Sequence, residues 1–235
     1  KNQNIKIYGF AKGSGMIQPN MGTMLVYIFI ECYLNNYELK KLINDNIDDS
    51  FNSISVDSDT STSDTLMLFS SSKKKINIKV KKNYQLLSNC LSSVMKDLAN
   101  QVVKDGEGLS KIIEVTVIKA KTKIQAKNIA FSVINSPLVK TAIAGEDPNW
   151  GRIIMAIGKS GENVQASKIQ IKFGNYLVTD QGKVAKEYNE SDLKEYMKWE
   201  SVDIEINLNI GNGLFTVYTC DFTHDYISIN ADYRN

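Results

Sequence analysis

The hydrophobic positions of the chain alternate between strand-like and helix-like spacing. Apolar residues already alternate with polar ones over residues 5–10, as in a strand, and the run MLVYIFI predicts a buried strand over residues 24–32. Residues 38–47, ELKKLINDNI, place their apolar side chains at helical intervals. The first part of the chain is therefore predicted to contain two strands followed by an amphipathic helix.

The middle of the chain continues this alternation. A turn-rich segment at 52–65, dominated by Ser, Asp and Thr, leads into an apolar strand at 66–69. A long helix is predicted over 83–103, a strand rich in β-branched residues over 111–120 and another helix over 122–135.

Pro137 interrupts the chain before the next predicted helix, and a loop at 145–149 separates that helix from one over 150–158. A short helix over 191–198 is predicted to have Ser191 as its N-cap. The remaining apolar segments predict strands at 168–173, 176–179, 202–210, 214–220 and 226–230. This interleaving, which shows no internal repeat, predicts a fold of the α/β class, an α+β layered sandwich.

Composition limits the partners that the protein is expected to have. The 235 residues include 28 basic and 26 acidic side chains, so the net charge of +2 provides no strong field for DNA or a membrane surface. The longest apolar run, residues 24–30, is far shorter than the roughly 20 residues that a membrane-spanning helix needs. Cys32, Cys90 and Cys220 are widely separated, which favours free thiols in a reducing compartment. We therefore expect a cytoplasmic protein that binds neither nucleic acid nor membranes.

Asp57, Asp59 and Asp64 offer one candidate metal site. Their D-x-D pattern is similar to the carboxylates with which some phosphoryl-transfer enzymes hold Mg²⁺. No paired acidic motif follows later, and the favoured interpretation is that these side chains form turns with their own backbone. His224 is the only histidine, and neither it nor the cysteines show the spacing of a zinc site. No metal site is predicted.

Two glycine-containing loops suggest ligand contacts of different kinds. The GSG sequence at 13–15 completes neither of the common phosphate-binding patterns. In DGEG, at 105–108, two glycines bracket Glu107, so the backbone can approach a neighbour closely while the carboxylate projects from the turn. Recognition of a substrate ammonium group and a plain tight turn are equal alternatives for this loop.

Gly22 and Thr23 stand where the buried strand begins. A threonine hydroxyl becomes an effective nucleophile when the residue is the first of a chain, because its own α-amine then serves as the base. This requires the Gly22–Thr23 peptide bond to break by an N-to-O acyl shift, for which glycine leaves steric room. The residues alone do not decide between this role and that of a β-branched residue opening a strand.

Five blocks of sequence carry a resemblance to a known family. They are KGSGMIQPNMGTML (12–25), SFNSISVDSDTSTSDT (50–65), DGEGLSKIIEV (105–115), SPLVKTAIAGEDPNWGRIIMAIGKSG (136–161) and CDFTHDYISINADYRN (220–235). Through these blocks, which stand in the family's order, the chain resembles ornithine acetyltransferase, the bifunctional glutamate N-acetyltransferase of arginine biosynthesis. The resemblance implies the self-processing, N-terminal-nucleophile-like fold of that family.

The resemblance also implies a maturation step and a reaction. The precursor would cleave itself between Gly22 and Thr23, so that residues 1–22 end the α chain and residues 23–235 form the β chain. Thr23 would then carry the acetyl group in a ping-pong transfer from N2-acetyl-L-ornithine to L-glutamate. No cofactor is implied, and the sequence leaves open whether acetyl-CoA is a further acetyl donor.

Matching positions imply a set of substrate contacts, to which Thr23 itself belongs. Lys12 resembles the family lysine that contacts substrate, which suits a cation facing an α-carboxylate. Glu107 matches the family's substrate-binding carboxylate, and Asn230 matches an asparagine that contacts the amino-acid substrate. Asn235, where the family usually ends in Ser or Thr, is a further predicted contact.

Two departures from the family pattern affect the expectations. Gly22 replaces the alanine that most members have before the nucleophile, which is compatible with the steric argument. The family's N-terminal half, with the Thr-Gly pair that forms its oxyanion hole, is absent from this sequence. We expect the chain to be inactive or poorly folded without it.

The family further implies small-molecule substrates, the α chain of the same precursor as partner, and an α2β2 heterotetramer. Two alternatives stay open. One is a related self-processing aminopeptidase or amidase, and the other is an inactive truncated fragment.

Overall fold

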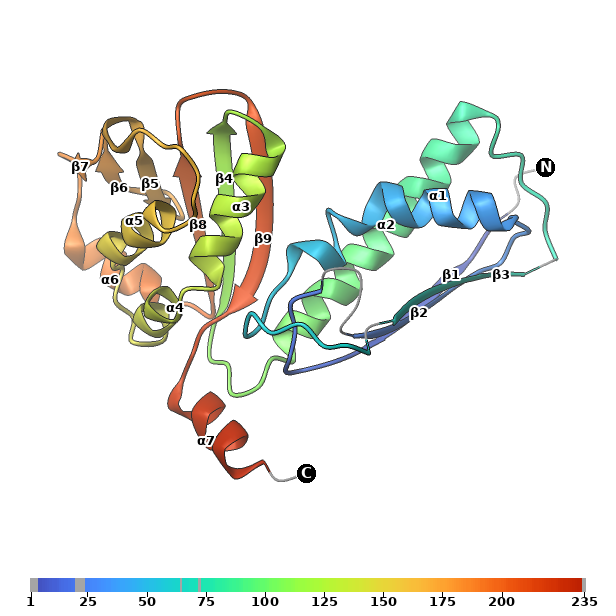
Figure 1. The fold of residues 1–235 in the computed structure, drawn as a ribbon, viewed down its shortest axis with the longest axis horizontal. Helices are drawn as coiled ribbons and strands as arrows, with labels where there is room; N and C mark the ends of the chain where they lie inside the picture. The colour runs from blue at the N-terminus through green and yellow to red at the C-terminus, as the bar shows by residue number, and fades with distance from the viewer. Residues whose placement is uncertain (1–3, 20–23, 64, 72, 234–235) are drawn as a thin grey trace. The chain divides into compact units, whose positions relative to one another are not determined.

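The computed structural model describes residues 4–19, 24–63, 65–71 and 73–233. The chain divides into two compact units, Lys1–Asp105 (unit 1) and Gly106–Asn235 (unit 2), and each has its own sheet (Figure 1). The cleavage expected after Gly22 would divide the chain into an α chain and a β chain at a point that differs from the boundary between these units. That division stays a prediction. Within the described ranges, no helix is both long and apolar enough to cross a membrane.

Unit 1 contains a three-stranded sheet with the order β1-β2-β3. Strand β1 (Ile7–Lys12) is antiparallel to β2 (Leu25–Ile30), and β2 is parallel to β3 (Thr65–Ser70). Two helices, α1 (Asn36–Ile47) and α2 (Lys81–Lys104), cover one face of this sheet (Figure 1).

Local signals explain both helices of unit 1. The side chain of Asn35 accepts a hydrogen bond from the Glu38 amide while the Glu38 carboxylate accepts one from the Asn35 amide, a reciprocal capping box at the start of α1. Helix α2 turns a stripe of apolar residues at spacings of three and four toward the sheet. Its buried apolar members are Leu87, Leu91, Met95, Leu98, Ala99, Val102 and Val103. A short 3₁₀ turn, η1 (Phe51–Ser53), packs against the same helix.

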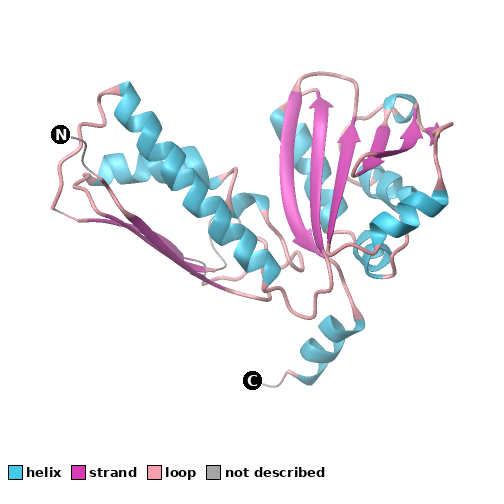
Figure 2. Cartoon of the chain, turned by 180° about the vertical axis from the view of Figure 1, so that it is seen from behind, coloured by secondary structure: helices cyan, strands magenta, loops and turns pink. Residues whose placement is uncertain are grey.

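The other face of the unit 1 sheet is apolar and exposed. Phe29 of β2 lies in its middle, with its ring stacked on Phe69 at 4.9 Å between centroids and edge-on to Phe10 at 6.5 Å. These three rings are 42%, 42% and 65% exposed. The same alternate positions of the three strands add further large side chains that are exposed, namely Tyr8, Leu25 and Met67. Figure 2 shows these strands from behind.

Unit 2 contains a six-stranded sheet with the order β7-β6-β5-β8-β4-β9. Its strands are β4 (Ile112–Ala120), β5 (Gln170–Phe173), β6 (Tyr176–Asp180), β7 (Lys183–Val184), β8 (Ser201–Asn207) and β9 (Gly213–Cys220). Central β4 runs parallel to β8, and the other neighbours are antiparallel. One face buries the core against helices α3 (Lys123–Ile134), α4 (Pro137–Ala144), α5 (Trp150–Gly158) and α6 (Glu190–Met197) (Figure 1). A 3₁₀ turn, η2 (Ala166–Lys168), precedes β5.

The opposite face of the unit 2 sheet is largely polar. The hydroxyls of Thr116 and Thr216 lie 2.9 Å apart on β4 and β9, and Lys172 pairs with Glu205 at 3.2 Å. Glu114 lies on this face, half-buried. Desolvation raises the pKa of the Glu114 carboxyl above its ordinary value, and the negative charge of Asp203 raises it further.

Two local predictions are wrong. Residues 226–230 were expected to form a strand, but they lie in helix α7 (His224–Asp232), which Thr223 caps by accepting a hydrogen bond from the Asp225 amide. None of the α7 residues, all of which are described, is buried, so the alternation of its apolar residues does not mark a sheet face. The N-cap of α6 is Asn189, whose side chain accepts from the Ser191 amide, and not Ser191 itself.

Candidate active site

The predicted cleavage site itself, Gly22 and Thr23, lies outside the described residues, as does Asn235. The described residues on either side are held in a defined register. Lys12, the last residue of β1, pairs with Leu25, which follows Thr23 by two positions in the sequence. The carbonyl of buried Met24 accepts a hydrogen bond from the Thr65 amide at 3.0 Å. The chain therefore enters and leaves the predicted cleavage site from fixed positions.

Asp57 anchors the approach to this site. Its carboxylate accepts hydrogen bonds from the amides of Met16 and Ile17, at 2.6 and 2.9 Å. Two neighbouring contacts extend the anchor: the Val56 amide donates to the Ile17 carbonyl at 2.6 Å, and the Thr60 hydroxyl donates to the Gln18 carbonyl at 2.9 Å. The Ser- and Asp-rich block thus binds the segment that precedes the predicted cleavage site, a role that sequence reasoning missed.

The bonds to Met16 and Ile17 join segments 40 or 41 positions apart and go beyond the predicted turns, whereas one local contact agrees with the turn interpretation. The Asp57 carboxylate also accepts from the Asp59 amide at 3.3 Å, as in an Asx turn. Asp64 lies outside the described residues. Among the residues that the structure does describe, no group of His, Cys, Asp and Glu has the arrangement of a metal site. The three cysteines are free, and burial raises the pKa of the Cys32 thiol to about 11, so that thiol is protonated at neutral pH.

Lys12 lines a hollow of about 590 Å³ within unit 1. The hollow lies between the end of β1 and the C-terminal end of α2, and Lys104 and Asp105 contribute to its wall. Lys12 is exposed, so its ammonium group is accessible to an anionic ligand. This position suits the expected contact with a substrate carboxylate.

Glu107 lies in unit 2, in the loop that precedes β4. Its neighbour Gly108 has φ of +64°, and a Cβ at this position would overlap the backbone of Asp225 and Tyr226 at the start of α7. Glycine is therefore required both by the left-handed backbone and by the close approach of α7. The close-approach argument made for the DGEG loop is confirmed, with α7 as the neighbour.

The structure brings Glu107 together with Asn230, which is 123 residues further along the chain. The Asn230 side-chain amide donates to Glu107 Oε2 at 2.9 Å, and also to the Tyr226 carbonyl one turn earlier in α7 at 3.0 Å. The second bond orients the amide, and the first orients the carboxylate. Glu107 is partly exposed, so this oriented carboxylate remains available to a cationic group.

Further contacts fix α7 to the loop of Glu107. The Thr223 hydroxyl donates to the Gly108 carbonyl. Asp221 is fully buried, and its carboxylate accepts from the amides of Ser110 and Lys111 at 2.8 and 3.0 Å. Buried carboxylates need such partners, because an unsatisfied one is costly to desolvate. Asp221 therefore ties the end of β9 to the start of β4.

The GEDPNWG loop at 145–151 is accounted for by local structure. Asn149 caps α5 by accepting from the Arg152 amide at 3.1 Å, and it donates to Asp147 at 3.0 Å. Glu146 pairs with buried Lys111 at 3.5 Å. The Arg152 guanidinium donates to the Leu138 carbonyl at 2.7 Å and so ties α5 to α4, and the loop also lines a hollow of about 600 Å³.

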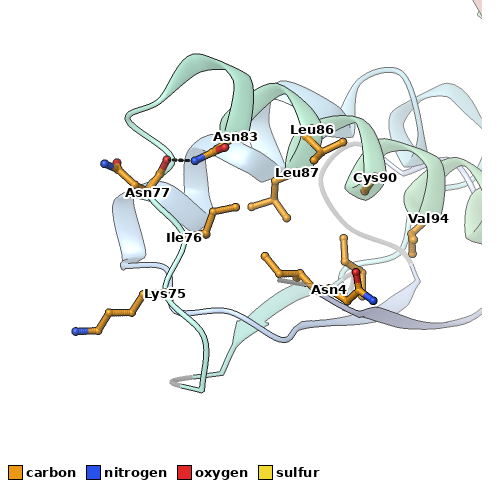
Figure 3. Close-up of a pocket in the computed structure, with 11 residues that line it drawn as sticks. Asn4, Lys75, Ile76, Asn77, Asn83, Leu86, Leu87, Cys90 and Val94 are labelled. Carbon is orange, nitrogen blue, oxygen red and sulfur yellow. Dashed lines mark hydrogen bonds between the residues drawn. The ribbon is translucent and has the colours of Figure 1, made fainter. Parts of the chain in front are cut away.

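A larger hollow, of about 920 Å³, lies elsewhere in unit 1 (Figure 3). It separates the start of β1 from helix α2, and its wall is formed by side chains such as Ile76, Leu86 and Leu87. The side-chain amide of Asn83, which lines the hollow, donates to the Asn77 backbone carbonyl at 3.0 Å (Figure 3). Of the predicted site residues that the structure describes, none lines this hollow.

Together these features define a layered α/β protein with candidate site residues in each unit, Lys12 in one and the Glu107–Asn230 pair in the other. A family model described as ArgJ family matches residues 1–235, so the chain belongs to the ArgJ family. The predicted α/β class and the resemblance to ornithine acetyltransferases are both confirmed at this level.

Individual relatives agree with this assignment. The chain is 48% identical over 231 residues to the arginine biosynthesis bifunctional protein ArgJ of Ruegeria pomeroyi, covering 98% of this chain and 56% of that protein. It is 45% identical over 237 residues to the protein of the same name from Brucella melitensis, covering 98% and 57%. A crystal structure of arginine biosynthesis bifunctional protein ArgJ from Bacillus halodurans superposes with a TM-score of 0.80 at 35% identity, covering 86% of this chain and 96% of that one. The chain thus spans somewhat more than half the length of these curated relatives.

Proposed function

We propose that the protein containing this chain is an acetyltransferase of arginine biosynthesis, which moves the acetyl group of N2-acetyl-L-ornithine to L-glutamate. The observation that supports this most directly is the Glu107–Asn230 pair. Membership of the ArgJ family supplies the reaction, and this pair supplies a carboxylate oriented to receive the ammonium group of an amino acid. The proposal includes small-molecule substrates and a cytoplasmic location for the protein.

In the proposed mechanism, cleavage between Gly22 and Thr23 frees the α-amine of Thr23, which acts as the base for its own hydroxyl. Thr23 Oγ attacks the acetyl carbonyl carbon of acetylornithine and forms an ester bond. The carbon–nitrogen bond to ornithine breaks, and the hydroxyl proton reaches the departing amine through the α-amine. The amino group of glutamate then attacks the ester, and the proton that it loses returns to Thr23 Oγ.

The substrate contacts follow from charge. Lys12 offers an ammonium group to the α-carboxylate of either amino acid, and Glu107 accepts hydrogen bonds from the side-chain ammonium of ornithine. Asn230 keeps the Glu107 carboxylate in one orientation, and Asn235 is proposed as an additional contact. Acetyl-CoA is a further proposed donor, whose acetyl group would reach the same Thr23 hydroxyl.

The apolar face of the unit 1 sheet supports the proposed partner. Proteins rarely leave a contiguous aromatic surface such as Phe10, Phe29 and Phe69 in water. The curated relatives are longer than this chain, which covers 56% and 57% of two of them. We propose that the additional portion, which would supply the rest of the α chain with its oxyanion hole, packs on this face, and that two such αβ pairs form the heterotetramer.

The test uses the complete precursor. The proposal predicts two fragments that separate between Gly22 and Thr23 in an intact-mass measurement, and transfer of acetyl from acetylornithine to glutamate with ping-pong kinetics. Thr23→Ala should abolish both. Amidase activity without acetyl transfer would instead support the aminopeptidase alternative, and unprocessed, inactive protein would support an inactive remnant.

A further inference from the structure

Lys140 is a buried lysine that none of the roles above employs. It lies in α4, and only 1% of its surface is exposed, so it is among the largest fully buried side chains of the described chain. Lysine is rarely buried unless its ammonium group has polar partners. Lys140 Nζ donates to the hydroxyl of Thr219 at 2.7 Å and lies 4.3 Å from the ring centroid of Phe222.

These two contacts fix the segment by which β9 leads into α7. Thr219 is a fully buried residue of β9, and Phe222 follows the end of that strand. A desolvated cation over an aromatic ring is attracted more strongly than the same pair in water. Lys140 therefore holds both the hydroxyl of the strand and the ring beyond it.

Phe222 transmits this position to α7. Its ring stacks on that of Tyr226 at 4.7 Å between centroids, with the planes 17° apart. The Tyr226 carbonyl in turn accepts the bond from the Asn230 amide, which also donates to Glu107. The contacts run without interruption from Lys140 through Phe222 and Tyr226 to the Glu107–Asn230 pair.

Helix α7 depends on such specific contacts, because none of its residues is buried. It has no hydrophobic stripe in a core, and Figure 1 shows it beyond the end of β9 rather than on the sheet. A helix held this way moves when one of its few attachments is removed. Its position, and with it that of Asn230, is thus sensitive to Lys140.

We propose that Lys140 is a positioning residue for the substrate site, acting through Phe222 and Tyr226 to keep Asn230 against Glu107. This inference rests on the proposed acetyltransferase function for its kinetic consequence. Its structural consequence, the attachment of α7, does not depend on activity. The two parts are therefore measured separately.

The experiment compares four variants in the complete precursor. Lys140→Met keeps most of the side-chain volume but removes the ammonium group, and Thr219→Val removes the hydroxyl that it binds, whereas Thr219→Ser keeps a hydroxyl. Lys111→Met is the matched control: Lys111 is also buried in unit 2, but its ammonium group contacts the Trp199 carbonyl and Glu146 rather than Thr219 or Phe222.

Hydrogen exchange followed by mass spectrometry reports on the attachment of α7. Lys140→Met and Thr219→Val should speed exchange of the amides of residues 224–232, by about tenfold for the lysine variant. Lys111→Met and Thr219→Ser should leave this exchange as in the wild type. Unchanged exchange in α7 for both Lys140→Met and Thr219→Val would overturn the inference, whether or not the wild type transfers acetyl groups.

Steady-state kinetics then separate positioning from a general loss of stability. Lys140→Met should raise the KM for acetylornithine about tenfold and change kcat by less than about twofold, because binding is weakened and the reacting groups are intact. An unchanged KM in an active Lys140→Met enzyme would contradict the positioning role of Lys140 but not the proposed acetyltransferase function. A wild type without acetyl transfer contradicts the proposed function, while the exchange data still decide the role of Lys140. If Lys140→Met does not fold, the Thr219→Val and Thr219→Ser pair gives the same decision.

Discussion

The two units use their sheets differently. Both cover one face with helices and leave the other open, but the open face of unit 1 carries Phe10, Phe29 and Phe69, whereas that of unit 2 carries Glu114 and the Thr116–Thr216 pair. An antiparallel or mixed sheet can present a polar face to water, but an aromatic face that stays in water does not contribute the free energy that burial of its apolar surface would provide. The open face of unit 2 is thus suited to water, whereas the open face of unit 1 is the one on which we propose that the partner packs.

The largest effect should come from placing a charge on each open face. Phe29→Lys in the complete precursor should cost about 3 kcal/mol or more and yield aggregated protein, because the lysine would be buried beneath the proposed partner. Thr216→Lys on the other open face should stay within about 0.5 kcal/mol of the wild type. Soluble yield and denaturant unfolding measure both. Equal tolerance of the two substitutions would contradict the proposed covering of unit 1.

Each unit also holds an aspartate that anchors a site loop, and replacing the two aspartates should have different effects. Asp57→Ala removes the bonds to the Met16 and Ile17 amides, and should slow cleavage at Gly22–Thr23 in a time course followed by gel or mass. Asp221→Ala leaves the amides of Ser110 and Lys111 without their acceptor, which should cost about 1–3 kcal/mol.

The distinguishing readouts are cleavage and substrate affinity. Asp221→Ala should raise the KM for acetylornithine with cleavage at the normal rate, whereas Asp57→Ala should slow cleavage first. Asp59→Ala is the control for Asp57, since the Asp59 side chain is exposed and Asp59 donates to Asp57 through its backbone amide, which the substitution keeps. Slow cleavage in Asp221→Ala would mean that the two anchors do not act separately.

A smaller effect should distinguish two glycines of unit 2. Gly108 and Gly161 both have positive φ, +64° and +76°, but a Cβ at 108 would meet the α7 backbone and one at 161 would meet open space. Both alanine variants should pay about 1–2 kcal/mol for the left-handed backbone. Only Gly108→Ala should also weaken substrate binding. Thermal unfolding and KM measured together would reveal the difference, and equal KM values would argue against the contact of the Glu107 loop with α7.

The smallest effect concerns pH and the polar face. Because the pKa of Glu114 is raised in the folded protein, its favourable contribution is fully present below the ordinary carboxyl pKa and is lost as the pH rises through the raised value. Glu114→Gln cannot ionise at this position. Its Tm should therefore be about 1–2 °C higher than that of the wild type at pH 8, and the same as that of the wild type at pH 3.5. A Tm difference that is the same at both pH values would show that ionisation of Glu114 is not its cause.

Local features of the chain were predictable to different degrees. The strand at residues 24–32 and the helices on either side of the 145–149 loop were predicted because apolar periodicity and proline act over a few residues. Helix α7 was misread as a strand because periodicity reports a buried face, and α7 has none. The start and position of that helix are set by its Thr223 N-cap and by the bond from the Thr223 hydroxyl to the Gly108 carbonyl.

The arrangement of the candidate site residues could not be predicted from the sequence. Resemblance named Glu107 and Asn230 separately, and only the fold shows that residues 123 positions apart share a hydrogen bond. The same holds for Asp57 and Met16, which are 41 positions apart. It also holds for Lys140, because nothing in the local sequence distinguishes this buried lysine from a surface lysine. Long-range contacts of this kind depend on the packing of whole elements, which no local pattern encodes.

The central claim is that Thr23 carries the acetyl group, and mass spectrometry of the mature protein tests it most directly. The cleaved wild type is incubated with N2-acetyl-L-ornithine in the absence of glutamate, and the fragment that begins at Thr23 is analysed. The account predicts that this fragment gains a single acetyl group on Thr23 and loses it when L-glutamate is added. A fragment that stays unmodified while the protein transfers acetyl groups, or that is acetylated at another residue, would contradict it.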